Sequence, residues 1–147
     1  MLMRRTVTSK TCAALMLMAI PSIGFAQETR TTLCDLAKHG QSFGGQRVRL
    51  TVIYMSDLQE RSVLLDRRCP KVRLGPYEPD EAPDPSVARF DDALRGRIGD
   101  LELRQFVVDV SGRFTWHGHD EPYGALEIQK VWSFKRIHGD WKKRRRS

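Results

Sequence analysis

Residues 106–116, FVVDVSGRFTW, carry the clearest strand pattern in this chain of 147 residues. Apolar side chains recur at alternate positions, and they are Phe106, Val108, Val110, Phe114 and Trp116. A period of two predicts a strand that buries one face in a core. Gly112 falls on that inward face, so we expect a bend or a bulge there.

Weaker patterns of the same kind flank this strand. We predict further strands over Val48–Tyr54, Ser62–Asp66, Lys71–Leu74 and Leu126–Phe134, with Ile53 and Lys130 as exceptions to their alternation. Before the strand at 106–116, four prolines within residues 75–85 exclude both a central strand and a helix interior. Asp84 and Pro85 then supply an N-cap and a first helical residue, and Gly96 or Gly99 ends this predicted helix.

A short helical turn is expected near the start of the body, through residues 33–37. Thr31 or Thr32 would cap it, and Gly40 would end it. The chain is therefore predicted to be all-β with one or two short helices. Five strands with a helix between the third and fourth follow the plan of a five-stranded OB-like barrel. A β-sandwich fragment and a small α+β sheet are the alternative architectures.

Short motifs on these elements carry a resemblance to a known group. They are CDL at 34–36, GQRVRL at 45–50, LLD at 64–66 followed by Cys69, and VDVSGRF at 108–114. In these motifs the chain resembles small exported bacterial proteins of unassigned function with an OB-like domain. The resemblance implies a disulfide within that domain, and it implies no activity and no catalytic residues.

The first 26 residues follow the pattern of a secretory signal peptide. Three basic residues precede an uncharged run at 11–25, and small residues stand three and one positions before the bond between Ala26 and Gln27. We predict cleavage at that bond, which gives a signal peptide at 1–26, a domain at 27–141 and a tail at 142–147. An uncleaved anchor is the alternative, but Pro21 interrupts a run already shorter than the ~20 residues of a spanning helix. The mature protein is expected to be periplasmic or secreted, without a transmembrane segment.

Cleavage would leave two cysteines, Cys34 and Cys69, in a compartment where disulfides persist. We predict a bridge between them. Such a bridge joins residues 35 positions apart, and the chain-entropy model then gives a stabilisation of about 3 to 4 kcal/mol. Two buried free thiols are the alternative.

The net charge of +7 is concentrated at the two ends of the chain. The leader holds three basic residues and the segment after Phe134 holds seven, which leaves 15 basic and 17 acidic residues between Gln27 and Phe134. This near-neutral body does not indicate a polyanion groove. The predicted anion contacts lie in the tail and are Lys142, Lys143, Arg144, Arg145 and Arg146. A solvated tail without a partner is the alternative.

The sequence contains no Gly-x-Ser-x-Gly motif and no phosphate-binding loop. We therefore predict no catalytic residues and no cofactor. One cluster, at residues 117–121, carries two imidazoles and two carboxylates, and His117, His119 and Asp120 are its candidate zinc or copper ligands. This loop defines a first alternative function, a metal-binding protein or metal-dependent enzyme. A turn with solvated side chains is the competing interpretation, because no further His or Cys lies at ligand spacing.

A second alternative function is binding of single-stranded nucleic acid or another polyanion. The basic side chains for it would be Arg61, Arg67, Arg68, Lys71 and Arg73. No aromatic residue lies between Ser56 and Pro76 to stack on bases, and Trp132 and Phe134 are expected to lie in the core. Nucleic acid is thus not the expected partner. The leading hypothesis is an exported, non-enzymatic binding module for an envelope or protein partner that the sequence does not identify.

Overall fold

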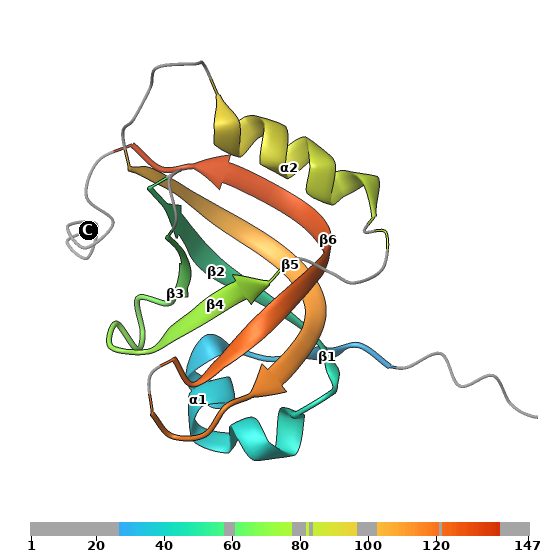
Figure 1. The fold of residues 1–147 in the computed structure, drawn as a ribbon, viewed down its shortest axis with the longest axis vertical. Coiled ribbons are helices and arrows are strands. Elements are labelled where there is room, and N and C mark those ends of the chain that lie inside the picture. Colours follow the sequence, from blue (N-terminus) through green and yellow to red (C-terminus); the bar gives the residue numbers. More distant parts are fainter. Residues whose placement is uncertain are drawn as a thin grey trace, which may run out of the picture.

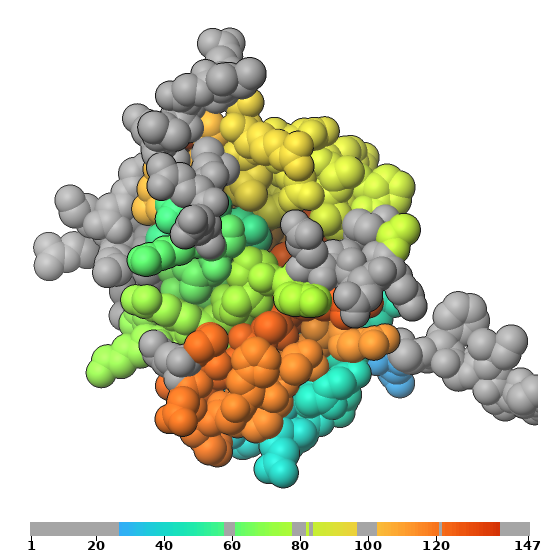
Figure 2. Space-filling model, in the orientation of Figure 1, coloured from blue at the N-terminus to red at the C-terminus, as the bar shows by residue number. Residues whose placement is uncertain are grey.

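The computed structural model describes residues 27–57, 61–77, 82, 84–96, 103–120 and 122–138. Two helices lie at opposite ends of a β-barrel (Figure 1). The elements are β1 Thr29–Arg30, α1 Leu33–Phe43, β2 Arg47–Ser56, β3 Ser62–Leu65, β4 Arg73–Tyr77, α2 Pro85–Arg95, β5 Arg104–Trp116 and β6 Gly124–Arg136. In the space-filling view, α2 runs along the top in yellow and α1 lies at the bottom in cyan (Figure 2). No helix in the described ranges is long and apolar enough to cross a bilayer.

Five strands close into a barrel in the order β2-β3-β4-β6-β5, and β5 pairs back onto β2. The pairing of β4 with β6 is parallel, and the other pairs within the barrel are antiparallel. This arrangement confirms the predicted five-stranded OB-like barrel. In chain order α2 follows the fourth strand instead of the third, because the two-residue β1 pairs with β2 ahead of the barrel strands.

Inward-facing side chains fill the barrel, as the alternation predicted. Val108, Val110 and Phe114 of β5 are fully buried among partners from β2 and β6. At one end Phe90 of α2 packs edge-on against Tyr54, with ring centroids 5.1 Å apart. At the other end Leu33 and Leu36 of α1 are fully buried. The two helices therefore close the ends of one core.

The helix α2 begins and ends as its flanking residues predict. The Asp84 side chain accepts a hydrogen bond from the Ser86 N–H, Pro85 is the first helical residue, and Gly96 follows the last. By contrast, α1 continues past Gly40 to Phe43, with a kink at His39. Gly40 is needed for packing, since a Cβ there would overlap the Trp116 ring. The predicted stop at Gly40 thus corresponds to the kink at His39, after which the helix resumes and runs to Phe43.

The strand β4 runs through Pro76, whereas the prolines of residues 75–85 were expected to exclude a central strand and the third strand was expected to end at Leu74. Arg73 and Leu74 pair with β3, whereas Gly75, Pro76 and Tyr77 pair with β6. At Pro76 the strand therefore has a partner on one side in the described sheet. A proline without an N–H is tolerated at such an edge-like position.

Two register shifts interrupt the pairing of β5 with β6. One lies at Ser111/Gly112, which confirms the irregularity expected at Gly112; a Cβ there would overlap the Glu127 carbonyl. The other lies at Asp109/Val110, opposite Ser133 and Val131, and leaves Trp132 between them unpaired. As a result Trp132 is 44% exposed, and its predicted place in the core was wrong, because a bulge changes which side chains face inward. Phe134 is 40% exposed, but it pairs with inward-facing Val108. Its ring packs against the core rings of Phe90 and Phe106, at 5.3 and 6.1 Å, so it lies at the edge of the core.

Candidate functional site

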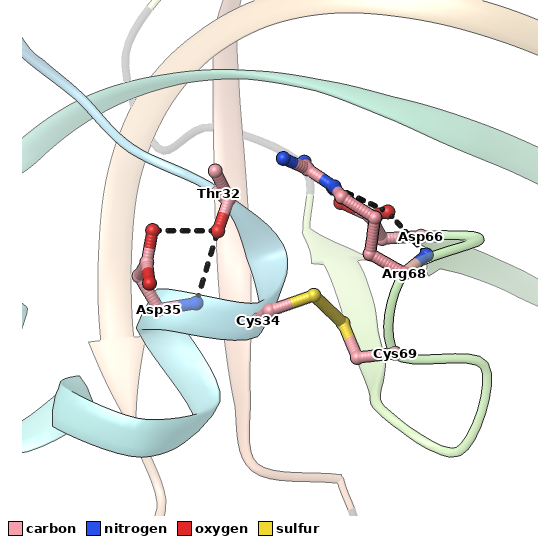
Figure 3. Close-up of a disulfide and its surroundings, with 6 residues drawn as sticks. All are labelled: Thr32, Cys34, Asp35, Asp66, Arg68 and Cys69. Atoms are coloured by element: carbon pink, nitrogen blue, oxygen red, sulfur yellow. Dashed lines mark hydrogen bonds and ion pairs between the residues drawn. A yellow bond between two sulfur atoms is a disulfide. The ribbon is translucent and has the colours of Figure 1, made fainter.

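A disulfide joins Cys34 in the first turn of α1 to Cys69 in the loop after β3, with the Cα atoms 5.7 Å apart (Figure 3). The predicted bridge is confirmed. It fastens α1 to the barrel beside the β3–β4 turn. A disulfide of this kind indicates a compartment that does not reduce it.

An ionised pair lies next to the bridge (Figure 3). Asp66 is 6% exposed, and it accepts hydrogen bonds from the backbone N–H and the guanidinium of Arg68. Burial raises the pKa of the Asp66 carboxyl, but these hydrogen bonds outweigh burial and the pKa lies below its usual value. The two sulfur atoms and an Asp66 oxygen lie within 4.8 Å of one another. With the sulfurs bonded to each other, no thiolate is free to hold a metal there.

Acid is expected to weaken the fold through Asp66. Because its pKa is lower in the folded chain, its ionised form stabilises the protein above the unfolded pKa of ~3.9, and this contribution disappears as the pH falls through the folded value. Urea unfolding of the wild type and of Asp66→Asn from neutral pH to pH ~3 measures it. We expect the stability difference between the two proteins to shrink in acid. Parallel pH dependences would contradict this role of Asp66.

The predicted metal ligands lie in the loop between β5 and β6. His117 donates its backbone N–H to the Tyr123 carbonyl at 3.0 Å, and the His119 ring packs edge-on against Trp116 at 5.2 Å. Within the described residues, His117, His119 and Asp120 do not bring three ligand atoms together. Glu121 lies outside the described residues. A metal site in this loop stays a prediction.

The predicted basic contacts divide between the barrel and the tail. Arg61, Lys71 and Arg73 are exposed, Arg67 is half-buried, and Arg68 pairs with Asp66 at 2.6 Å. Tyr77, at the end of β4, is 58% exposed. The tail cations Lys142 to Arg146, and Ala26 of the predicted cleavage site, lie outside the described residues, which begin at Gln27.

Apolar side chains also occupy the outside of the barrel. Ile53 points outward between inward-facing Val52 and Tyr54, and its register partners are Leu65 on β3 and Val107 on β5. Ile137, just after β6, packs into the same cluster. We call Ile53, Leu65, Val107 and Ile137 the outer patch. Ile53, Leu65 and Ile137 are buried, but Val107 is 38% exposed.

A hollow of about 250 Å³ opens on the outer patch. Its lining includes the apolar side chains of Ile53, Leu65 and Val107. Arg67 and the ion pair of Arg68 with Asp66 line it as well. On the other side, Lys135 is the exposed register partner of Val107. The Ile137 N–H bonds to the Gln105 carbonyl at 2.7 Å, so the chain leaves the barrel toward its basic tail at this patch.

A second surface feature surrounds Trp132. The Arg49 guanidinium lies 4.1 Å from the ring centroid, and the Lys130 ammonium lies at the same distance. Arg49 is fixed by two hydrogen bonds to Asp109, of 3.0 and 2.7 Å, which raise its pKa. The indole N–H donates to the Ser111 hydroxyl at 2.9 Å. This exposed indole is thus held by three side chains, one from each of three strands, and Asp109 in turn fixes Arg49.

A cleft of about 380 Å³ lies beside Trp132, between α2 and β6. It is lined by Ser86, Arg89, Val131, Trp132, Ser133 and Phe134. Sequence reasoning missed this site because it assumed an unbroken alternation in β6. The signal was the polar exception Lys130, next to the point where the inward positions step by three, from Ile128 to Val131.

Comparison with protein-family models, with curated proteins and with solved structures gave no match. The resemblance to small exported bacterial proteins therefore stays a prediction beyond the barrel itself.

Proposed function

We propose that this chain is an exported, non-enzymatic binding module of the periplasm or the secreted fraction, and that it attaches to an anionic membrane surface. The observation that carries the proposal is the outer patch, where an apolar hollow, flanking cations and the start of the basic tail coincide. Apolar surface rimmed by charge is typical of interaction sites on proteins and membranes.

Charge complementarity selects a bilayer with anionic headgroups. The folded body is near neutral, yet Arg67 and Lys135 flank the outer patch, where Arg68 is neutralised by Asp66. Five more cations follow His138 within eight positions. Each cation near an anionic bilayer contributes on the order of 1 kcal/mol. Stable attachment to a membrane requires a second signal besides charge, and Val107 with the hollow beneath it supplies the apolar one.

Removing residues 142–147 is expected to weaken binding to vesicles of phosphatidylglycerol at least about tenfold, because five near-surface cations are lost. Vesicle co-sedimentation at low salt measures the partition coefficient. Pure phosphatidylcholine vesicles should bind the full chain weakly, and high salt should reduce the difference between the two lipids. Unchanged binding of the shortened chain would contradict a role for the tail.

The apolar part is tested with a matched pair of substitutions on β5. Val107→Glu places a charge on the outer patch, and Thr115→Glu places the same charge on an exposed position near the far end of the strand. Both variants lower the net charge equally, so a purely electrostatic attachment predicts equal losses. We expect Val107→Glu to weaken phosphatidylglycerol binding several-fold more than Thr115→Glu. Equal losses would overturn the outer patch as the contact surface.

A further inference from the structure

The side chain of Trp132 is exposed, yet specific contacts hold its ring in place. A bulge turns the side chain outward, and Arg49, Lys130 and Ser111 then hold it in place. Bulges that redirect a side chain are frequent next to binding and active sites. A rigid, partly apolar ring with little rotamer entropy left to lose is a favourable wall for a ligand.

The cleft beside Trp132 combines apolar and polar walls. Trp132 and Phe134 are both exposed in part, and Ser86 of α2 and Ser133 of β6 also line the cleft. The volume of about 380 Å³ falls in the range of small-ligand pockets. Two ring-bearing walls with a few polar groups favour a compact, flat ligand over an extended polymer.

One cation on this cleft is not committed to a partner. Arg89 is exposed on α2, and within the described residues it forms no hydrogen bond or ion pair. The neighbouring carboxylate of Asp84 is already used: it accepts from the Ser86 N–H at 2.9 Å and lies 3.8 Å from Lys130. The Ser86 hydrogen bonds, with Lys130 and Arg89 nearby, keep the pKa of Asp84 below its usual value. An anionic ligand group would therefore meet an available guanidinium at Arg89.

We propose that the cleft between α2 and β6 binds a small aromatic anion, with its ring against Trp132 and Phe134 and its acidic group on Arg89. This site lies apart from the outer patch, and it does not depend on attachment to membranes. The guanidinium selects phosphate or carboxylate because it offers two parallel N–H donors to their oxygens.

Calorimetric titration with 2-naphthyl phosphate and with uncharged 2-naphthol separates the two parts of this recognition. We expect the phosphate to bind at one site per chain, more tightly than the alcohol. Arg89→Ala should weaken the phosphate about tenfold and leave the alcohol within about twofold, since a charge-assisted contact is lost. Trp132→Ala should weaken both probes, because both carry the ring.

Matched controls exclude general effects of charge and of exposed rings. Arg95→Ala removes the same charge from the C-terminal end of α2, outside the lining of the cleft. Tyr77→Ala removes an exposed aromatic ring from β4. Both should leave the affinity for 2-naphthyl phosphate within about twofold of the wild type, as expected for non-contacting surface residues. The proposal is overturned if Arg95→Ala matches Arg89→Ala, if Arg89→Ala weakens both probes equally, or if no saturable binding is found at millimolar probe. Arg89→Glu, at an exposed helix position, gives a second variant of the same contact.

Discussion

Replacing Phe90 with alanine is expected to lower the free energy of unfolding by about 3 to 5 kcal/mol. Phe90 is 2% exposed, and its ring lies 5.1 Å from Tyr54, 5.5 Å from Phe106 and 5.3 Å from Phe134. The substitution removes the central ring of this aromatic cluster, and the barrel walls around it are held in place by closed pairing. A cavity that cannot collapse is costly. Urea denaturation followed by circular dichroism measures the loss.

Two further substitutions in α2 test that interpretation. Phe90→Leu keeps most of the apolar volume and should cost clearly less than alanine. Arg89→Ala, one residue earlier on the exposed side, should change stability by no more than about 0.5 kcal/mol. If Phe90→Ala costs no more than Arg89→Ala, then α2 does not close the end of the barrel as described.

The barrel was predictable from sequence because apolar residues alternate clearly along its strands, and because residues at both ends of α2 mark that helix. The alternation around Val108 and Val110 identifies the inward face of β5 without knowledge of its partners. Asp84, Pro85 and Gly96 mark the ends of α2 through hydrogen bonds and dihedral angles that belong to neighbouring residues. Such signals survive in one sequence because their causes lie within a few positions of each other.

The candidate sites were less predictable because their causes lie far apart in the chain. Trp132 is exposed because β6 shifts register against β5, and a strand pattern read alone does not contain its partner's register. Ile53 was visible as an apolar residue on a polar face. Its contact with Ile137, however, depends on the path of the chain after β6, which the pattern around Ile53 does not contain.

Pro76 illustrates the same limit for exclusions. Proline is disfavoured in a central strand because successive backbone N–H groups there bond to the two neighbouring strands alternately, and proline has no N–H to donate. In β4 the two partners take different residues, so a position that looks central by strand order behaves as an edge. The composition of residues 75–85 correctly marks the link to α2 but places its start too early.

Removing the disulfide is expected to destabilise the protein by about 3 to 4 kcal/mol, a large share of the stability of a small domain. The bridge joins residues 35 positions apart, and this loop contains β2 and β3. Without it the unfolded chain gains freedom, while Leu33 and Leu36 still hold α1 against the core. The double variant Cys34→Ser, Cys69→Ser should therefore fold in the same barrel and unfold at a lower urea concentration.

Two comparisons decide how the bridge acts. Reduction of the wild type should reproduce the loss seen in the double variant, because both remove the same loop constraint. The slope of the unfolding free energy with urea reports how compact the unfolded chain is, and it should increase when the bridge is absent. Equal stability with and without the bridge would mean that the core alone holds α1 in place. A loss of the expected size would instead make the fold depend on an oxidising compartment, which ties its stability to the export that the leader predicts.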